Sequence, residues 1–256
     1  MHRPIVFVTD YGRDDAYAAA LIGAAWRFDP RAICVDGTHG VPPGDILAGA
    51  YHLKSLALAF ERDVVLCGVV DPGVGTARRA IAIDAGSFIC VAPDNGLVSY
   101  LWTEAPSVER AVVALAIPYG ASPTFHGRDV FAPAAAQLAT GVRLLEAGEP
   151  ISGPVLLDDA FAHRDGATVH GRVILMDHFG NAITTIRARD LAGARIARVA
   201  WDTGETSSAV TTYDNITDGV AALIGSAGHL EIAARRSSAL EHGGPPVGAA
   251  VSVELA

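Results

Sequence analysis

Short apolar runs alternate with longer segments of helical periodicity along the first part of the chain. Strand-like runs cover residues 5–8, 32–35, 64–70, 81–83 and 88–91, and helical patterns cover residues 14–28, 46–60 and 130–140. The run at 64–70 is apolar almost throughout, which is typical of a strand covered on both faces, as in a parallel sheet. This alternation predicts an N-terminal α/β layered domain with a mostly parallel sheet.

After residue 159 the pattern changes to short β-prone runs separated by Gly, Asp and Asn. These runs cover residues 169–176, 182–186, 196–201, 220–224, 230–233 and 251–255, and only residues 187–191 resemble a short helix. Several short strands with turn residues between them predict a small antiparallel barrel or sandwich. We therefore expect an α/β protein of two domains, residues 1–160 and a smaller C-terminal β-barrel domain over residues 166–256.

Composition narrows the class of protein. Of the 256 residues, 50% are hydrophobic and 18% are charged, so the chain can bury a core. The net charge of −9, without Lys or Arg clusters, argues against a nucleic-acid partner and suits a cationic small molecule. No apolar run approaches the roughly 20 residues of a membrane span, and the first residues lack a signal-peptide pattern. We expect a cytoplasmic protein without a membrane partner, whose Cys34, Cys67 and Cys90 are buried thiols.

Polar residues gather where the predicted strands end. Five loops carry Asp, His or Arg, namely residues 9–15, 36–40, 71–79, 92–96 and 124–129. In an α/β sheet, ligands bind in the crevice at the carboxyl ends of the strands. Because these loops converge on one rim of the predicted sheet, we expect an active site there.

Several of these residues also have a structural interpretation. Asp14 is suited to capping a helix, as is Asp45 before residues 46–60. Asp36 and Asp94 are typical turn residues, and His39 is equally consistent with a core histidine bonded to the backbone.

The glycines of residues 71–79 lack the spacing of a phosphate-binding loop. Asp10 could simply accept hydrogen bonds from loop amides. Asp71, Arg78 and His126 are harder to explain structurally, because a buried charge is costly unless it is paired.

Six motifs occur in order along the chain. They are V-T-D-Y-G, D-G-T-H-G-V-P-P-G-D-I, V-D-P-G-V-G-T-A-R, A-P-D-N-G-L-V-S, T-F-H-G-R-D-V-F-A-P and D-H-F-G-N-A-I-T-T-I. Together they resemble the S-adenosyl-L-methionine hydroxide adenosyltransferases, relatives of the fluorinating and chlorinating enzymes, and the resemblance runs from Pro4 to about Leu255. It implies hydrolysis of S-adenosyl-L-methionine to adenosine and L-methionine, with no cofactor and no metal. It also implies a C-terminal β-barrel and a homotrimer with the substrate between domains of neighbouring subunits.

The resemblance also implies roles for individual residues. Asp71, Arg78 and His126 match a triad that handles the attacking water, and Asp10 matches the residue that holds the ribose hydroxyls. The remaining substrate contacts that it implies are Phe125, Asp177, Phe179 and Asn181.

Halide-using relatives carry Tyr in place of Asp71 and Ser in place of Gly127, so the residues of this chain favour water. One departure is Gly44, where relatives carry an aromatic residue.

These side chains suggest a division of labour. Placing a water in line with the ribose 5′ carbon can supply about 7–11 kcal/mol of the barrier, and general-base help adds roughly 10²- to 10⁴-fold. Arg78 beside Asp71 would hold the carboxylate in place to orient the water. His126, whose ordinary pKa is about 6.5, is then expected to take the proton.

Two other functions remain open from the sequence. Asp10-x-Gly12-x-Asp14-Asp15 has the spacing of a calcium site in metal-dependent nucleoside hydrolases, although Val8 stands where those enzymes carry a further Asp. The second alternative is a non-catalytic module that binds S-adenosyl-L-methionine or adenosine. Dependence of cleavage on metal would favour the first, and recovery of intact ligand without turnover would favour the second.

Overall fold

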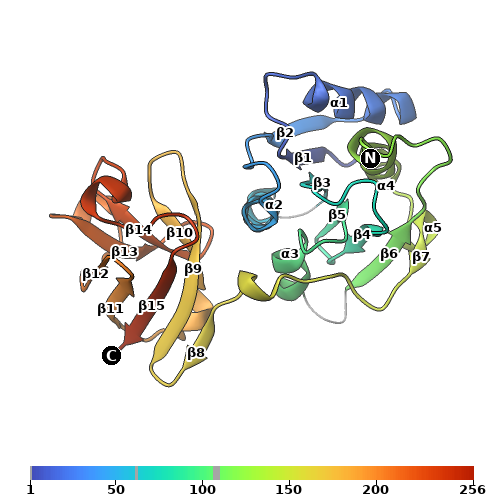
Figure 1. Ribbon diagram of the computed structural model, residues 1–256. Coiled ribbons are helices and arrows are strands. Elements are labelled where there is room, and N and C mark those ends of the chain that lie inside the picture. Colours follow the sequence, from blue (N-terminus) through green and yellow to red (C-terminus); the bar gives the residue numbers. More distant parts are fainter. Residues whose placement is uncertain (1, 61–62, 106–109) are drawn as a thin grey trace. The chain divides into compact units, whose positions relative to one another are not determined.

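The chain folds into two compact units. The computed structural model describes residues 2–60, 63–105 and 110–256, and contacts divide it into Met1–Leu157 and Asp158–Ala256 (Figure 1). Within these described residues, no helix is both long and apolar enough to cross a membrane.

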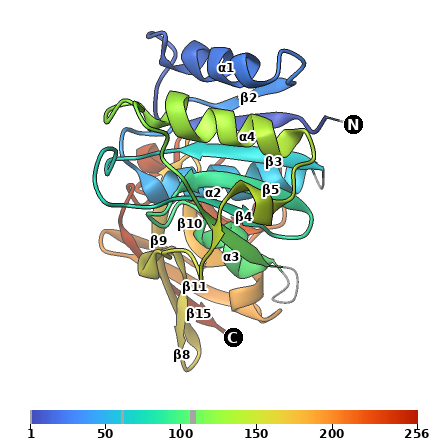
Figure 2. The ribbon, with the colours of Figure 1, turned by 90° about the vertical axis from the view of Figure 1, so that its right-hand side faces the viewer.

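The N-terminal unit is a seven-stranded sheet with helices on both faces (Figure 2). Its strands are β1 (Ile5–Thr9), β2 (Cys34–Thr38), β3 (Val64–Val69), β4 (Ala80–Asp84), β5 (Phe88–Pro93), β6 (Ala111–Leu115) and β7 (Glu149–Pro150), in the order β2-β1-β3-β5-β4-β6-β7. Its helices are α1 (Tyr17–Phe28), α2 (Ile46–Phe60), α3 (Ser99–Glu104), α4 (Ala132–Ala139) and α5 (Leu144–Ala147). The strands β1 and β3 are buried along their whole length, as their continuous apolar runs predict.

The expectation of a mostly parallel sheet is wrong, because the sheet is mixed. β2, β1, β3 and β5 are parallel neighbours, whereas β4 is antiparallel to both β5 and β6, and β7 is antiparallel to β6. The turn between β4 and β5 is only Ala85, Gly86 and Ser87, with Gly86 at φ +84°. Parallel neighbours need a crossover of a dozen or more residues, so this short turn forces an antiparallel hairpin. The parallel half of the sheet carries the loops of the predicted rim.

The ends of the helices follow local chemistry in most places. Asp45 caps α2, since its Oδ1 accepts a hydrogen bond from the Ala48 amide at 2.9 Å. Asp14 does not cap α1, which begins at Tyr17 without a side-chain cap. The helix expected over residues 130–140 is a π-helical turn, Gly127–Phe131, that runs directly into α4.

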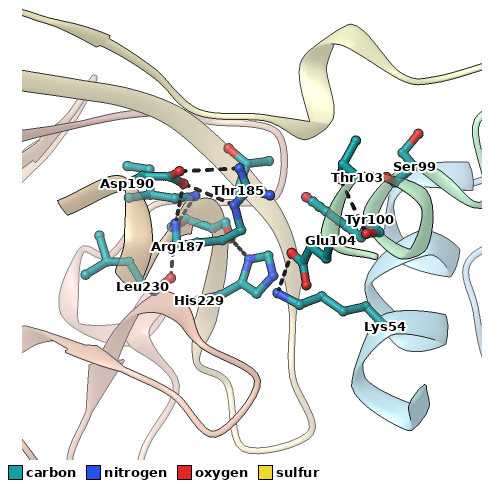
Figure 3. A network of polar contacts seen from close by, with 12 residues as sticks. Lys54, Ser99, Tyr100, Thr103, Glu104, Thr185, Arg187, Asp190, His229 and Leu230 are labelled. Carbon is teal, nitrogen blue, oxygen red and sulfur yellow. Dashed lines mark hydrogen bonds and ion pairs between the residues drawn. The ribbon is translucent and has the colours of Figure 1, made fainter. Parts of the chain in front are cut away.

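The two faces of the N-terminal sheet have different packing. On one face, α1 and α4 pack with odd-numbered residues of β1 and β3 in one hydrophobic cluster, with Phe7 and Phe131 fully buried. On the other face, α2 and α3 are joined by an ion pair between Lys54 Nζ and Glu104 Oε1 at 3.3 Å (Figure 3). The side chain of Lys54 is only 7% exposed, and a buried charge of this kind needs its partner.

The C-terminal unit is an antiparallel sheet that is nearly barrel-shaped. Its strands are β8 (His163–Asp165), β9 (Thr168–Met176), β10 (Ala182–Arg187), β11 (Ile196–Trp201), β12 (Gly204–Thr206), β13 (Val220–Ile224), β14 (His229–Ala234) and β15 (Ala250–Leu255). The order is β12-β11-β15-β9-β10-β14-β13, and β8 pairs with β9. A bridge between Ala209, just after β12, and Ala222 of β13 brings the two edges together. All six predicted strands are confirmed, and the short helical segment is a 3₁₀ turn, Ala188–Leu191.

Buried polar side chains in the C-terminal unit are held by the strands around them. Arg187 at the end of β10 is 8% exposed and forms an ion pair with Asp190 at 3.1 Å (Figure 3). His229, which is fully buried, contacts the carbonyl oxygen of Thr184 through Nδ1 at 2.7 Å. Each of these two side chains thus has a polar partner inside the unit, as buried polar groups generally do.

Candidate active site

A cavity of about 340 Å³ opens at the carboxyl ends of β1 and β3 in the N-terminal unit. Its lining comes from four loops and consists of Asp10, Tyr11, Pro43, Gly44, Asp71, Pro72, Val74, Thr124, His126 and Gly127. Three of the residues singled out from the sequence, Asp10, Asp71 and His126, therefore meet in one hollow. The place agrees with the crevice rule for α/β sheets.

Asp71 and Arg78 form a buried, two-point ion pair beside this cavity. Arg78 Nε donates to Asp71 Oδ1 at 2.9 Å, and Nη2 donates to Oδ2. The two side chains are 6% and 9% exposed, and the guanidinium carbon lies 5.1 Å from the ring centroid of Phe131. The planar guanidinium thus fixes the carboxylate in one orientation.

The same guanidinium contacts His126. Arg78 Nη2 and His126 Nδ1 are 2.9 Å apart. Because arginine has donors only, Nδ1 must accept, and a neutral ring then carries its proton on Nε2. Burial, followed by the positive charge of Arg78, lowers the pKa of His126 below its ordinary value of 6.5. The imidazole is therefore neutral near pH 7, in a single tautomer.

At Gly75, the backbone of the Asp71–Arg78 loop lies close to the backbone of the segment that precedes His126. Gly75 has φ +78°, and a Cβ atom there would lie 2.5 Å from the carbonyl oxygen of Pro123. The nearby Gly73 has only ordinary contacts. The second glycine of D-P-G-V-G-T is thus required for the close approach of two loops.

Asp129 forms a second ion pair near the site and also binds the loop that precedes His126. Asp129 accepts hydrogen bonds from Arg128 Nε at 2.7 Å and from the Ser122 amide at 2.9 Å. The contact with Ser122 connects the loop that precedes His126 to the π-helical turn Gly127–Phe131, which begins directly after His126. π-Helical turns are rare in proteins, and those that occur are often found at functional sites.

Only one of the two carboxylate oxygens of Asp10 accepts a hydrogen bond from the described residues. Its Oδ2 accepts a hydrogen bond from the Gly44 amide at 2.8 Å, whereas Oδ1 has no partner within the described part of the chain. Gly44 has φ +73°, a conformation that an aromatic residue rarely adopts. The loop-amide interpretation of Asp10 is thus correct for one oxygen, and the other is available to a ligand.

Phe125 does not line the cavity. Its ring lies in an aromatic cluster with Tyr11 and Tyr17, at centroid distances of 5.7 and 5.3 Å. The guanidinium carbon of Arg128 lies 5.0 Å from the centroid of the same ring. Phe125 therefore supports Tyr11, which does line the cavity.

Asp177, Phe179 and Asn181 lie together in the turn between β9 and β10 of the C-terminal unit. Asp177 Oδ1 accepts from the amides of Phe179 at 2.9 Å and Asn181 at 2.8 Å, and Asp177 Oδ2 accepts from Asn181 Nδ2 at 2.8 Å. Gly180 has φ +84° within this turn. The arrangement presents the ring of Phe179, which is 75% exposed, while Asn181 is buried.

Other polar residues of the rim contact side chains of the N-terminal unit, which differs in detail from the backbone-bonded histidine and the turn aspartates expected from the sequence. His39 is buried and bridges Thr9 Oγ1 at 2.8 Å and Asp36 Oδ1 at 3.2 Å. Asp94 is buried, pairs with Arg79 Nε at 2.7 Å and accepts from the Val155 amide at 2.7 Å.

Tyr11 is the cavity residue that sequence reasoning missed. It follows Asp10 directly in V-T-D-Y-G, and burial, with nearby negative charges, raises the pKa of its hydroxyl above the ordinary value. The only sequence signal was its place in the motif, because a tyrosine after a strand is equally typical of a core.

The described residues contain no group of three or more His, Cys, Asp or Glu side chains that could hold a metal ion. The calcium-site alternative therefore depends on sequence spacing alone.

Comparison with known proteins identifies the class. Residues 5–148 match the SAM hydroxide adenosyltransferase N-terminal domain, and residues 171–252 match the SAM hydroxide adenosyltransferase C-terminal domain. The chain therefore belongs to the SAM hydroxide adenosyltransferase family, and the resemblance seen in the motifs is confirmed.

Individual relatives agree with this assignment. An (R)-S-adenosyl-L-methionine hydrolase from Thermus thermophilus is 37% identical over 250 residues, which cover 93% of this chain and 94% of that protein. A protein of the same name from Salinispora arenicola is 45% identical over 183 residues, covering 69% of each chain. The crystal structure of an uncharacterized conserved protein from Thermotoga maritima matches with a TM-score of 0.87 at 28% identity, covering 97% of this chain and 99% of that one.

Proposed function

We propose that this protein hydrolyses S-adenosyl-L-methionine to adenosine and L-methionine. The observation that carries the proposal is the buried Asp71–Arg78–His126 contact at the cavity that also holds Asp10. A non-catalytic binding module would have no use for two charges and an imidazole fixed beside the cavity at the cost of burial. Family membership and the hydrolase names of the relatives support the same reaction.

The reaction requires one proton acceptor and no acid. The water oxygen forms a bond to the ribose 5′ carbon while the bond from that carbon to the sulfonium breaks, and sulfur keeps the electron pair as a neutral thioether. The water loses one proton. Holding water and substrate in line therefore matters most, since positioning can supply about 7–11 kcal/mol.

One donor nitrogen of Arg78 has no hydrogen-bond partner among the described residues. Its Nη1 is buried without a hydrogen-bond partner, which costs about 1–3 kcal/mol if nothing binds it. Because this atom is closed off from solvent and lies on the side of the guanidinium away from Asp71, the handling of water is supported by Asp71 and His126, which line the cavity.

The contacts reverse the roles that the sequence suggested for Asp71 and His126. His126 Nδ1 already accepts from Arg78, so Nε2–H is a donor and the ring has no free lone pair for a proton. Asp71 uses one lone pair on each oxygen for Arg78 and keeps another. We therefore assign proton acceptance to Asp71 and a hydrogen-bond donor role to His126.

The remaining substrate contacts follow the matching positions of the family. The free Oδ1 of Asp10 supports its proposed bond to a ribose hydroxyl, and the exposed ring of Phe179 supports an apolar contact with the substrate. Asp177 and Asn181 would contact the substrate from the same turn, and Phe125 would contribute through Tyr11 rather than directly. With Asp at 71 and Gly at 127, water is preferred over halide.

The larger organisation belongs to the same proposal. Residues 1–160 would form the domain that carries the water-handling triad, and residues 166–256 the domain that completes the substrate site. The active form would be a cytoplasmic homotrimer that uses neither a metal nor a cofactor.

The test is direct. Purified protein is incubated with S-adenosyl-L-methionine, with and without EDTA, and adenosine and methionine are separated by chromatography. We expect both products in equal amounts, unaffected by EDTA, and a loss of at least about 10²-fold in Asp71→Asn. Arg79→Lys is the matched control, because Arg79 contacts Asp94 and the carbonyl oxygen of Gly153 and does not line the cavity.

The other outcomes discriminate between the alternatives. Cleavage that requires a metal would favour a nucleoside hydrolase. Intact ligand recovered from the protein without any product would favour a binding module.

A further inference from the structure

The hydroxyl of Tyr11 is a polar group for which the fold provides no partner. Tyr11 lines the cavity together with Asp71 and His126, and no described residue forms a hydrogen bond with its Oη. The oxygen is not one of the unpartnered polar atoms that are closed off from solvent. Since Tyr11 lines the cavity, we infer that its Oη faces the open space there. Burial and the nearby carboxylates of Asp10 and Asp71 raise its pKa, which keeps it a protonated donor.

Gly127 makes room for this hydroxyl. A Cβ atom at position 127 would overlap the Tyr11 oxygen, and its next neighbours would be Leu21 Cδ2 at 3.0 Å and Tyr11 Cζ at 3.2 Å. The backbone of Gly127 is helical, so the requirement for glycine here is the space beside Tyr11 and not an unusual conformation. Because Gly127 follows His126 directly, the hydroxyl lies beside the catalytic triad.

The ring of Tyr11 is held rigidly. It packs against Tyr17 and Phe125 at centroid distances of 5.9 and 5.7 Å, and Phe125 is itself covered by Arg128. Three aromatic rings therefore fix the direction of a hydroxyl that has no partner of its own. A polar group held in this way is suited to hydrogen-bond a ligand in the cavity.

We propose that the Tyr11 hydroxyl is a positioning group for the attacking water, and that Gly127 is required because its missing side chain is the space this hydroxyl occupies. The inference rests on the proposed function. Tyr11 donates one hydrogen bond to the water oxygen and takes no part in proton transfer, which remains with Asp71.

Tyr11→Phe tests the hydroxyl alone. We expect kcat for adenosine formation to fall about tenfold, the size of one neutral hydrogen bond. The KM for S-adenosyl-L-methionine and the melting temperature should change little, because the ring packing is retained. Tyr17→Phe is the matched control in the same aromatic cluster and should keep full kcat. Full kcat in Tyr11→Phe would overturn the proposal.

The coupling with Gly127 is tested by a double-mutant cycle. Gly127→Ala should lower both kcat and the melting temperature in the presence of the tyrosine, because the new methyl group displaces the hydroxyl. In the Tyr11→Phe background the same change should cost much less, since the contacts that remain, Leu21 Cδ2 at 3.0 Å and the ring carbon Cζ at 3.2 Å, are looser than the one to the hydroxyl oxygen. Equal losses in both backgrounds would contradict the role of Gly127.

The two proposals fail in different ways. If the unmodified protein forms no adenosine, the proposed function is wrong, and the melting temperatures of the cycle still report whether Tyr11 and Gly127 compete for one space.

Discussion

At the scale of single residues, Arg78 organises the candidate site. One guanidinium contacts both oxygens of Asp71, Nδ1 of His126 and the face of Phe131. Because it can only donate, it decides the tautomer of the histidine as well as the orientation of the carboxylate. The arginine therefore sets which atoms of the other two members are free to interact with a ligand.

This arrangement predicts the titration of His126. Burial and the charge of Arg78 lower its pKa, so the folded state binds fewer protons than the unfolded state at pH values just below 6.5. The stabilising contact is complete above pH 6.5 and is lost as the pH falls below it. The C2–H resonance of His126 should titrate below 6.5 by NMR, assigned with His126→Gln.

Two variants give opposite shifts. Arg78→Met should raise the midpoint, because the neighbouring positive charge is removed, and Asp71→Asn should lower it further. Arg79→Met should leave it unchanged. A midpoint at or above 6.5 in the unmodified protein would show that His126 is not held as a buried neutral acceptor.

At the scale of elements, the site depends on loops that end strands rather than on the strands themselves. β1 and β3 bring Asp10 and Asp71 to one edge of the sheet, and a π-helical turn brings His126 there from a distant part of the chain. At Gly75 the Asp71–Arg78 loop approaches the backbone of the segment that precedes His126.

Gly75→Ala should therefore destabilise the loop. An alanine at φ +78° costs about 1–2 kcal/mol, and its Cβ would meet a backbone oxygen that cannot rotate away. We expect a loss of roughly 2–4 kcal/mol in unfolding free energy by urea titration and a marked fall in activity. Gly73→Ala in the same loop, with ordinary contacts, should lose less than about 1 kcal/mol. Equal effects would show that Pro123 does not constrain the loop.

At the scale of the whole molecule, two units of different architecture carry the residues proposed to bind one substrate. The net charge of −9 suits a cationic sulfonium substrate. Family members' motifs occur in both units, and both family domains match.

The proposed homotrimer is measurable. Light scattering coupled to size-exclusion chromatography should give about 80 kDa for three chains of 26.5 kDa. A mass near that of one chain, in a preparation that still forms adenosine, would contradict a site that needs neighbouring subunits.

The sequence by itself predicted most of the longer elements, the family and the candidate site residues. Continuous apolar runs predicted β1 and β3, short β-prone runs between turn residues predicted the C-terminal strands, and Asp45 predicted the start of α2. The six motifs identified the family and pointed to Asp10, Asp71, Arg78 and His126. Apolar runs and a helix cap depend on neighbouring residues only. The motifs are short stretches of sequence that can be matched without knowledge of the fold.

Only the tertiary structure decided the direction of the strands, the partners of the polar side chains and the tautomer of His126. The antiparallel placement of β4 and β6 depends on pairing across the sheet, which short apolar runs do not encode. Contacts between Arg78 and His126, and between Tyr11 and Gly127, join positions far apart in the chain. Which nitrogen of His126 accepts, and where an unpartnered hydroxyl points, follow from distances of a few ångströms that exist only after the loops meet.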